Sequence, residues 1–141
     1  MRCEQIMKRE VVCLSPEESV QVAARRMKAE NVGFLPVCDA AKKVLGTLTD
    51  RDIALRVIAE GRTAATKCAD VMTREVIACR PEDDLRRAQD LMTSNLKSRI
   101  MCTDASDKLV GVISLSDIVQ TETAERATET MRGITLREAH A

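Results

Sequence analysis

Aromatic residues are nearly absent from this sequence. It has no Trp, no Tyr and one Phe among 141 residues, so it lacks the stacking surfaces on which proteins bind single-stranded nucleic acids. The 22 basic and 22 acidic side chains cancel to a net charge of zero. This balance removes the broad positive charge of a protein that binds nucleic acid through its phosphates. We therefore expect no nucleic-acid partner.

Long apolar runs and clusters of metal ligands are missing as well. No stretch approaches the roughly 18 apolar residues of a membrane-spanning helix, and residues 1–10 contain no apolar signal core. The sequence has one histidine, His140, and six cysteines that form no Cys-x-x-Cys pair, whereas a structural zinc site needs closely spaced ligands. We expect a cytoplasmic protein without a metal ion and without a membrane partner.

The chain does contain a second copy of itself. Residues 3–53 align without a gap with residues 68–118, at an offset of 65, and 15 of these 51 positions are identical. Ordinary composition would give roughly 3 identities. Two copies are too few for a solenoid, so we expect them to pack face to face about an approximate twofold axis.

Both copies show the same succession of patterns. Short apolar runs indicate strands, and Ser19 and Asp84 are good N-cap residues for the amphipathic segments that follow them. A strand–helix–strand crossover makes the first two strands parallel, and a short polar turn makes the last two antiparallel. The expected strands are residues 11–14, 34–37 and 44–48 in the first copy, and 76–79, 100–102 and 109–113 in the second.

These patterns predict an α/β fold of two repeats, each with the order strand, helix, strand, strand, helix. Each repeat forms a three-stranded sheet with helices on one face. The predicted division is repeat 1 at residues 1–61, a connector at 62–67, repeat 2 at 68–120, and a polar C-terminal helix or tail at 121–141. Because residues 120–132 are polar on nearly every face, we expect a solvated helix or a tail that needs a partner.

A hydroxyl followed three residues later by an acid ends the third strand of each copy. The pairs are Thr49 with Asp52 and Ser114 with Asp117. The structural interpretation is a capping box at the start of a helix. The functional interpretation is a site for a ribose phosphate, in which the hydroxyl and the free N–H groups hold the phosphate and the carboxylate accepts both ribose hydroxyls.

Two further features fit a ribose phosphate ligand. Gly46 and Gly111 precede the hydroxyls, and a strand glycine lets a ligand approach the backbone. With so few aromatic residues, the slot for a base would be aliphatic and made by strand residues such as Val12, Leu35 and Pro36.

With these motifs in view, the sequence resembles a tandem pair of cystathionine-β-synthase (CBS) domains. The resemblance spans about residues 3–118 and includes Leu35-Pro36-Val37 and Thr49-Asp50-Arg51-Asp52-Ile53. It implies a regulatory, energy-sensing module that binds AMP, ADP, ATP or S-adenosylmethionine, forms a homodimer through the helices after the third strands, and acts on a downstream protein.

The resemblance also implies a role for each matching residue. Thr49 and Ser114 would contact phosphate, Asp52 and Asp117 would hold ribose, and the remaining apolar positions would enclose adenine. Arg51 and Arg99 are the expected cations for the phosphate. The residues around a nucleotide would be Val12, Cys13, Leu35, Pro36, Thr49, Arg51 and Asp52 in the first copy, and Ile77, Ala78, Arg99, Ile100, Met101, Ser114 and Asp117 in the second. Because Met101 replaces the usual proline, we expect the first copy to match the family pattern better.

Cys13 and Cys38 end the first and second strands of the first copy. Parallel neighbouring strands lie about 4.8 Å apart, so the two sulfurs could form a disulfide, which a few stand-alone CBS pairs also carry. The alternative is two buried thiols that act as small apolar residues. The other four cysteines are most simply packing residues.

The sequence shows no nucleophile–base pair, metal cluster or phosphate-binding Walker loop, so we expect a protein that is not an enzyme and needs no cofactor. The alternative to a nucleotide sensor is a structural or redox-responsive interaction module with empty clefts, in which the hydroxyl–acid pairs are only caps.

Overall fold

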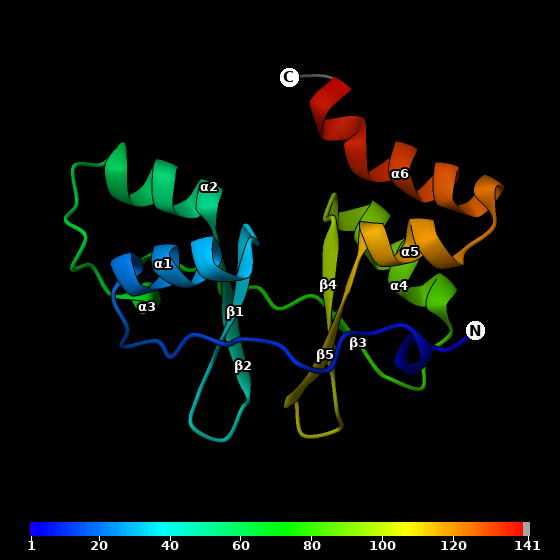
Figure 1. Ribbon diagram of the computed structural model, residues 1–141, viewed down its shortest axis with the longest axis horizontal. Coiled ribbons are helices and arrows are strands. Elements are labelled where there is room, and N and C mark those ends of the chain that lie inside the picture. The colour runs from blue at the N-terminus through cyan, green and yellow to red at the C-terminus, as the bar shows by residue number, and fades with distance from the viewer. Residues whose placement is uncertain (140–141) are drawn as a thin grey trace. The chain divides into compact units, whose positions relative to one another are not determined.

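Two compact units make up the computed structural model, which describes residues 1–139 (Figure 1). The first, called here the β1 unit, is Val12–Val76. The second, the β4 unit, combines Met1–Val11 with the chain from Ile77 onward. His140 lies outside the described residues. The fold is mixed α/β, as the sequence predicted.

Four helical segments and two strands form the β1 unit. Its first helix begins where Ser19 caps it, as predicted, because the Ser19 hydroxyl accepts a hydrogen bond from Val22 N at 3.2 Å. The elements are α1 (Val20–Glu30), β1 (Phe34–Cys38), β2 (Val44–Thr49), α2 (Asp50–Asp52), the π-helix η2 (Ile53–Ile58) and α3 (Cys68–Val71).

The β4 unit shares the helix, strand, strand, helix order and adds a first strand and a final helix. Its cap is also the predicted one, since the Asp84 carboxylate accepts a hydrogen bond from Arg86 N at 2.9 Å. The elements are the 3-10 turn η1 (Cys3–Gln5), β3 (Ala78–Cys79), α4 (Leu85–Asn95), β4 (Arg99–Thr103), β5 (Leu109–Ser114), α5 (Leu115–Thr121) and α6 (Ala124–Ala139).

The β4 unit has the expected three-stranded sheet, and the β1 unit does not. In the β4 unit, β3 pairs parallel with β4, and β4 pairs antiparallel with β5. In the β1 unit only β1 and β2 form a sheet, and Leu14 makes an isolated parallel bridge with Val37. The prediction of a strand over residues 11–14 was therefore wrong. Pro36, which replaces Met101 at this repeat position, has no N–H to continue the ladder toward Cys13.

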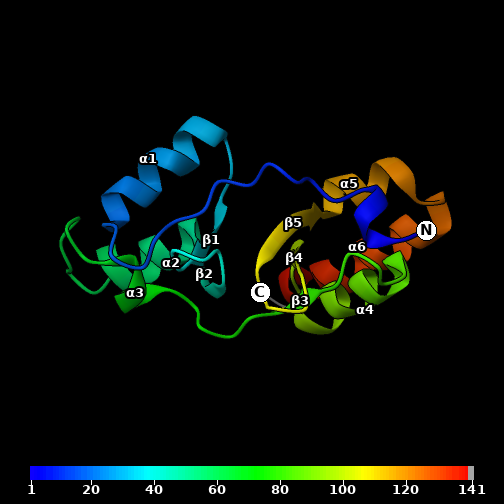
Figure 2. The ribbon, with the colours of Figure 1, turned by 90° about the horizontal axis from the view of Figure 1, so that it is seen from below.

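The leading segment of each sequence repeat packs with the other repeat. Residues near Cys3 belong to the β4 unit, where Cys3 N donates to Asp83 O at 2.9 Å, while their repeat equivalents near Cys68 belong to the β1 unit, where Cys68 N donates to Glu18 O at 2.8 Å. Figure 2 shows the N-terminal turn beside the start of α4. Each packing unit therefore consists of most of one sequence repeat together with the leading segment of the other repeat.

Each unit has its own apolar core. The β1 unit buries Leu14, Val20, Ala23, Met27, Leu35, Val37, Leu48, Val57, Cys68, Val71 and Met72. The β4 unit buries Cys3, Met7, Cys79, Leu85, Ala88, Met92, Ile100, Cys102, Ile113, Ile118 and Ile134. Within residues 1–139, no helix has the length and apolar character needed to cross a membrane.

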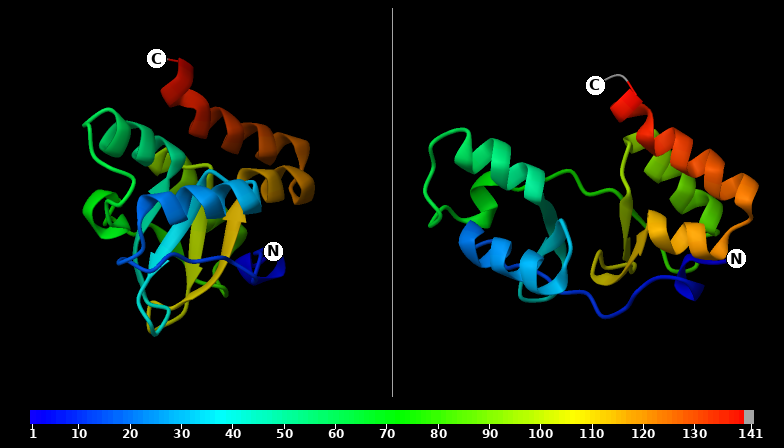
Figure 3. Two further views of the ribbon diagram at one scale, coloured as in Figure 1. Left: turned by 60° about the vertical axis from the view of Figure 1, so that its left-hand side comes forward. Right: turned by 45° about the horizontal axis from the view of Figure 1, so that its top comes forward.

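The C-terminal segment is a helix that packs on its own unit. The prediction of a solvated helix or a partner-dependent tail was incomplete, because Ala127, Thr130 and Ile134 of α6 are buried. Figure 3 shows α6 lying along α4 and α5. Helices α4 and α6 approach closely at Gly133, where a Cβ atom would clash with the Thr93 methyl group. Ile134, beyond the predicted polar stretch, supplies the apolar contact that residues 120–132 lack.

Replacing the buried Ile134 tests this packing. Ile134 is 2% exposed, so we expect Ile134→Ala to lower the free energy of unfolding by about 2–4 kcal/mol, because the change leaves a cavity in the core. Leu136→Ala is the matched control, since Leu136 is 52% exposed on the same helix and should change stability by less than about 0.5 kcal/mol. Urea unfolding measures both variants, and equal stabilities would contradict the packing of α6.

Candidate ligand site

The register of the β4–β5 hairpin brings two predicted site residues together. Arg99 is the Cα partner of Ser114, so the strand begins one residue earlier than the sequence indicated and includes the arginine. Leu115 N, at the start of α5, donates to Ser98 O at 2.8 Å. The first residues of β4 and α5 therefore lie side by side.

Both predicted hydroxyl–acid pairs form capping boxes. The Thr49 hydroxyl accepts from Asp52 N at 3.1 Å, while an Asp52 oxygen accepts from Thr49 N at 3.0 Å. At the start of α5, Ser114 and Asp117 make the same two bonds at 3.2 and 2.8 Å. The structural interpretation of this motif is therefore confirmed, and a ligand at either place would add to an existing cap.

A cation faces the second oxygen of each capping carboxylate. Asp52 Oδ1 lies 3.7 Å from Arg56 Nε, and Asp117 Oδ1 lies 3.6 Å from Lys8 Nζ. The caps use Oδ2 in both cases. A ribose hydroxyl at either carboxylate would share Oδ1 with this cation.

The two copies place their predicted phosphate cation on different elements. In the first copy Phe34 faces Thr49 across the hairpin, and the cation is Arg51 at the start of α2. In the second copy Arg99 faces Ser114, and the position equivalent to Arg51 is Ser116. Each copy thus has one predicted phosphate arginine, which belongs to the helix in the first copy and to the strand in the second.

A cavity of about 380 Å³ opens at the start of α5. Two of the predicted residues, Arg99 and Ser114, line it, and among the described residues the Arg99 guanidinium has no hydrogen-bond or ion-pair partner. Sequence reasoning missed its other lining residues, which are Ser98 before β4 and residues of α5 and α6. The full lining is Ser98, Arg99, Ser114, Leu115, Ser116, Val119, Gln120 and Met131.

The residues expected to enclose a base lie mostly inside the units. The side chains of Leu35, Pro36, Ile100 and Met101 are buried, and the last two are each 2% exposed. Val12, Cys13, Ile77 and Ala78 are half-buried, and Val12 and Ile77 pack against the core of their own unit. None of the eight lines the cavity at α5.

Each of the two strand glycines makes room for the backbone of the leading segment from the other sequence repeat. A Cβ atom at Gly46 would lie 2.5 Å from Thr73 O, and one at Gly111 would lie 3.1 Å from Lys8 O. Lys8 and Val112 exchange backbone hydrogen bonds beside Gly111. The expectation that these glycines admit a ligand was therefore wrong, because the protein's own backbone occupies that space.

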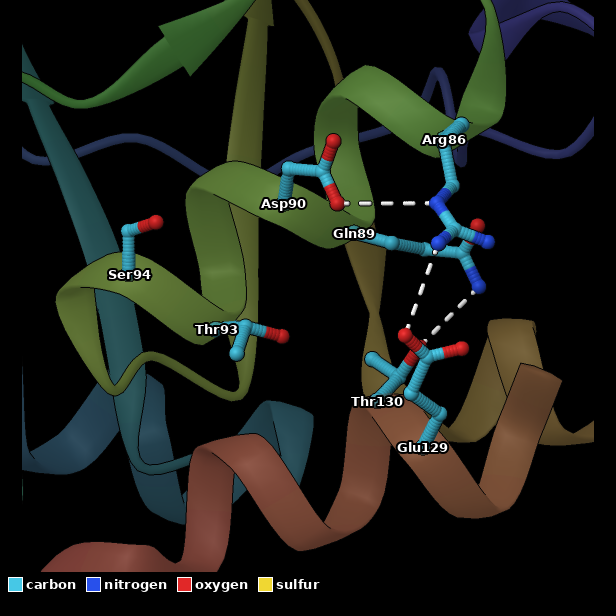
Figure 4. Close-up of a pocket in the computed structure, with 7 residues that line it drawn as sticks. All are labelled: Arg86, Gln89, Asp90, Thr93, Ser94, Glu129 and Thr130. Carbon is cyan, nitrogen blue, oxygen red and sulfur yellow. Dashed lines mark hydrogen bonds and ion pairs between the residues drawn. The ribbon is translucent and has the colours of Figure 1, made fainter.

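A second cavity of about 380 Å³ lies between α4 and α6 (Figure 4). Gln89 Nε2 donates to Thr130 Oγ1 at 3.0 Å, and Arg86 lies 3.4 Å from a Glu129 oxygen. Gln89 is 3% exposed, and its Oε1 has no hydrogen-bond partner. These contacts hold α6 against α4. They leave Gln89 Oε1 as a buried acceptor without a hydrogen-bond partner among the described residues.

The six cysteines fall into two chemical groups. All are free. Cys13 is half-buried, and a hydrogen bond from Cys38 lowers the pKa of its thiol to about 7, while the same contact raises the pKa of Cys38. In the other unit Cys79 Sγ lies 3.4 Å from Cys102 Sγ, and this hydrogen bond, with burial, raises the pKa of Cys79 to about 12. The contact with Cys38 therefore favours the thiolate of Cys13, whereas the pKa of Cys79 is raised.

Metal ligands do not gather in the described part of the chain. Within residues 1–139, no three His, Cys, Asp or Glu side chains form a group that could hold a metal ion.

Comparison with known proteins supports the repeat and the fold. The CBS domain pattern matches residues 3–59 and 68–123. This chain belongs to the CBS domain family. The CBS pair is 38% identical over 112 residues to the CBS domain-containing protein YhcV of Bacillus subtilis, covering 79% of each chain.

Two further proteins are similar to this chain. Over 132 residues the chain is 28% identical to the inosine-5'-monophosphate dehydrogenase of Methanocaldococcus jannaschii, of which it spans 26%. The crystal structure of the CBS domain pair of protein MJ0100 superposes with a TM-score of 0.77 at 22% identity, covering 85% of this chain and 94% of that one. The likeness to MJ0100 concerns the fold alone.

Proposed function

We propose that this CBS pair is a regulatory module that binds an adenosine-type ligand, such as AMP, ADP, ATP or S-adenosylmethionine, and does not turn it over. The observation that carries the proposal is the cavity at α5, where Arg99 and Ser114 meet through the hairpin register. A guanidinium and a hydroxyl at a helix N-terminus suit a phosphate or another anionic group.

The rest of the cavity supports a nucleoside. Its volume of about 380 Å³ lies within the range of small-molecule sites, which combine apolar walls with a few polar groups. Asp117, one turn into α5, does not line the cavity, and its Oδ1, which the cap does not use, would be shared between a ribose hydroxyl and Lys8. The MJ0100 pair was solved in complex with 5'-methylthioadenosine and S-adenosyl-L-methionine, which supports the ligand class.

A regulatory module acts through another chain. We propose a homodimer formed by the helices after the third strands, since Leu55 and Ile58 of η2 and Val119 of α5 are exposed apolar side chains. We also propose a downstream protein partner, and a cytoplasmic location in which the six thiols stay reduced. Light scattering tests the assembly, because the mass of a single 15.6 kDa chain would rule out a homodimer.

The thiol pair of the β1 unit favours a second candidate function. Cys13 and Cys38 share a hydrogen bond, and the low pKa of Cys13 makes it a thiolate near neutral pH. In a redox-responsive module, a peroxide would oxidise Cys13 to a sulfenic acid, and the Cys38 thiol would displace water to form the disulfide. In this alternative the clefts stay empty.

Removing the Arg99 guanidinium tests the nucleotide proposal. A charge-assisted contact contributes about 1.5–3 kcal/mol, so we expect Arg99→Ala to weaken binding of AMP, ADP, ATP or S-adenosylmethionine by about ten- to a hundredfold in calorimetry. Arg87→Ala is the matched control, because Arg87 is an exposed arginine of the same unit and its loss changes the net charge equally. Equal affinities of the two variants would contradict the site, and no heat from any ligand with the folded wild type would contradict the function.

Alkylation at different pH values tests the redox candidate. We expect iodoacetamide to modify Cys13 at a rate that rises with a midpoint near pH 7, since only the thiolate reacts, and Cys79 to remain unmodified below pH 9 because its pKa is about 12. Peroxide should then produce a Cys13–Cys38 disulfide in peptide mass spectra. Six free thiols after peroxide treatment would exclude this function, and Cys38→Ala, which removes the hydrogen-bond donor, should move the Cys13 midpoint upward.

A further inference from the structure

The helix α6 lies outside the CBS repeat and yet forms part of the candidate ligand site. The family pattern ends at residue 123, and α6 begins at Ala124. Its Met131 lines the cavity together with Arg99 and Ser114. Because the first sequence copy is followed by a connector and the second copy, it has no counterpart of this helix.

Met131 is one of three apolar residues that line the cavity. Leu115 and Val119 of α5 are the other two, whereas the remaining lining residues are polar, namely Ser98, Arg99, Ser114, Ser116 and Gln120. The strand residues expected to hold a base are buried in the core or absent from this lining. A ligand whose anion meets Arg99 would therefore place its apolar part against α5 and α6.

The residues just before Met131 hold α6 in place. Thr130 accepts the hydrogen bond from Gln89 at 3.0 Å, and Glu129 pairs with Arg86 at 3.4 Å, so both contacts join α6 to α4 (Figure 4). Met131 itself is 42% exposed. A ligand group that packs against Met131 therefore adds a contact to α6 next to the residues that hold α6 against α4.

We infer that Met131 is a specificity-determining residue for the ligand of the α5 cavity, that it packs against the base, and that occupancy of the cavity therefore stabilises α6 on its unit. This inference rests on the proposed nucleotide function and extends it. The site of the second copy becomes distinct from that of the first because a helix outside the repeat completes it. A ligand that contacts α6 stabilises only the state in which α6 is docked, which makes the helix a reporter of occupancy.

Variants of Met131 test the inference in the full chain. We expect Met131→Ala to weaken binding of the tightest of AMP, ADP, ATP and S-adenosylmethionine by about fivefold, because the apolar contact is lost. Met131→Leu keeps the apolar volume and should stay within about twofold of the wild type. Leu136→Ala is the matched control, since Leu136 is an exposed apolar residue of α6 that does not line the cavity. Calorimetry measures all four proteins.

Amide hydrogen exchange supplies a second measurement that does not depend on a variant. Saturating ligand should slow exchange in residues 124–136 of the wild type, because occupancy holds α6 in its docked state. If the wild type binds and Arg99→Ala does not, while Met131→Ala binds normally or α6 exchange is unchanged, the inference is wrong and the nucleotide function stands. If the wild type binds none of the four ligands, both are wrong.

Discussion

The antiparallel register of β4 and β5 is the constraint on which the candidate site depends. It sets Arg99 opposite Ser114 and brings the first amide of α5 to Ser98 O. Because side chains alternate between the two faces of a strand, a shift of one residue would move Arg99 to the other face. Capping by Ser114 and Asp117 then begins α5 directly at the end of β5. The hydroxyl, the cation and the helix N-terminus therefore meet without a loop between them.

The same hairpin in the β1 unit carries its predicted phosphate cation at a different repeat position. Phe34 occupies the position of Arg99, and Arg51 occupies that of Ser116. Each copy has one predicted phosphate arginine. The cysteines diverge further, because the pKa of Cys13 is lowered beside Cys38 whereas the pKa of Cys79 is raised beside the buried Cys102. Ligand binding and thiol chemistry are thus favoured in different units of one duplicated fold.

Residues close together in sequence were sufficient to predict the capped helices. The remaining features of the fold and the site depend on contacts between residues distant in sequence. The caps at Ser19 and Asp84 depend on adjacent backbone groups, so the sequence was sufficient to find α1 and α4. The missing strand before Leu14 depends on Pro36, which lies 22 residues away. The Lys8 backbone, and not a ligand, occupies the space beside Gly111, because the leading segment of the first repeat packs in the β4 unit. Met131 could not be assigned to the site, since the packing of α6, with Ala127, Thr130 and Ile134 buried, depends on contacts distant in sequence.

A crystal structure of the protein with its tightest adenosine ligand would test the central claim most directly. The account predicts an anionic group within hydrogen-bond distance of the Arg99 guanidinium and the Ser114 hydroxyl, with the base against Met131 and Val119. Full occupancy of a ligand elsewhere, with the α5 cavity holding only water, would contradict it.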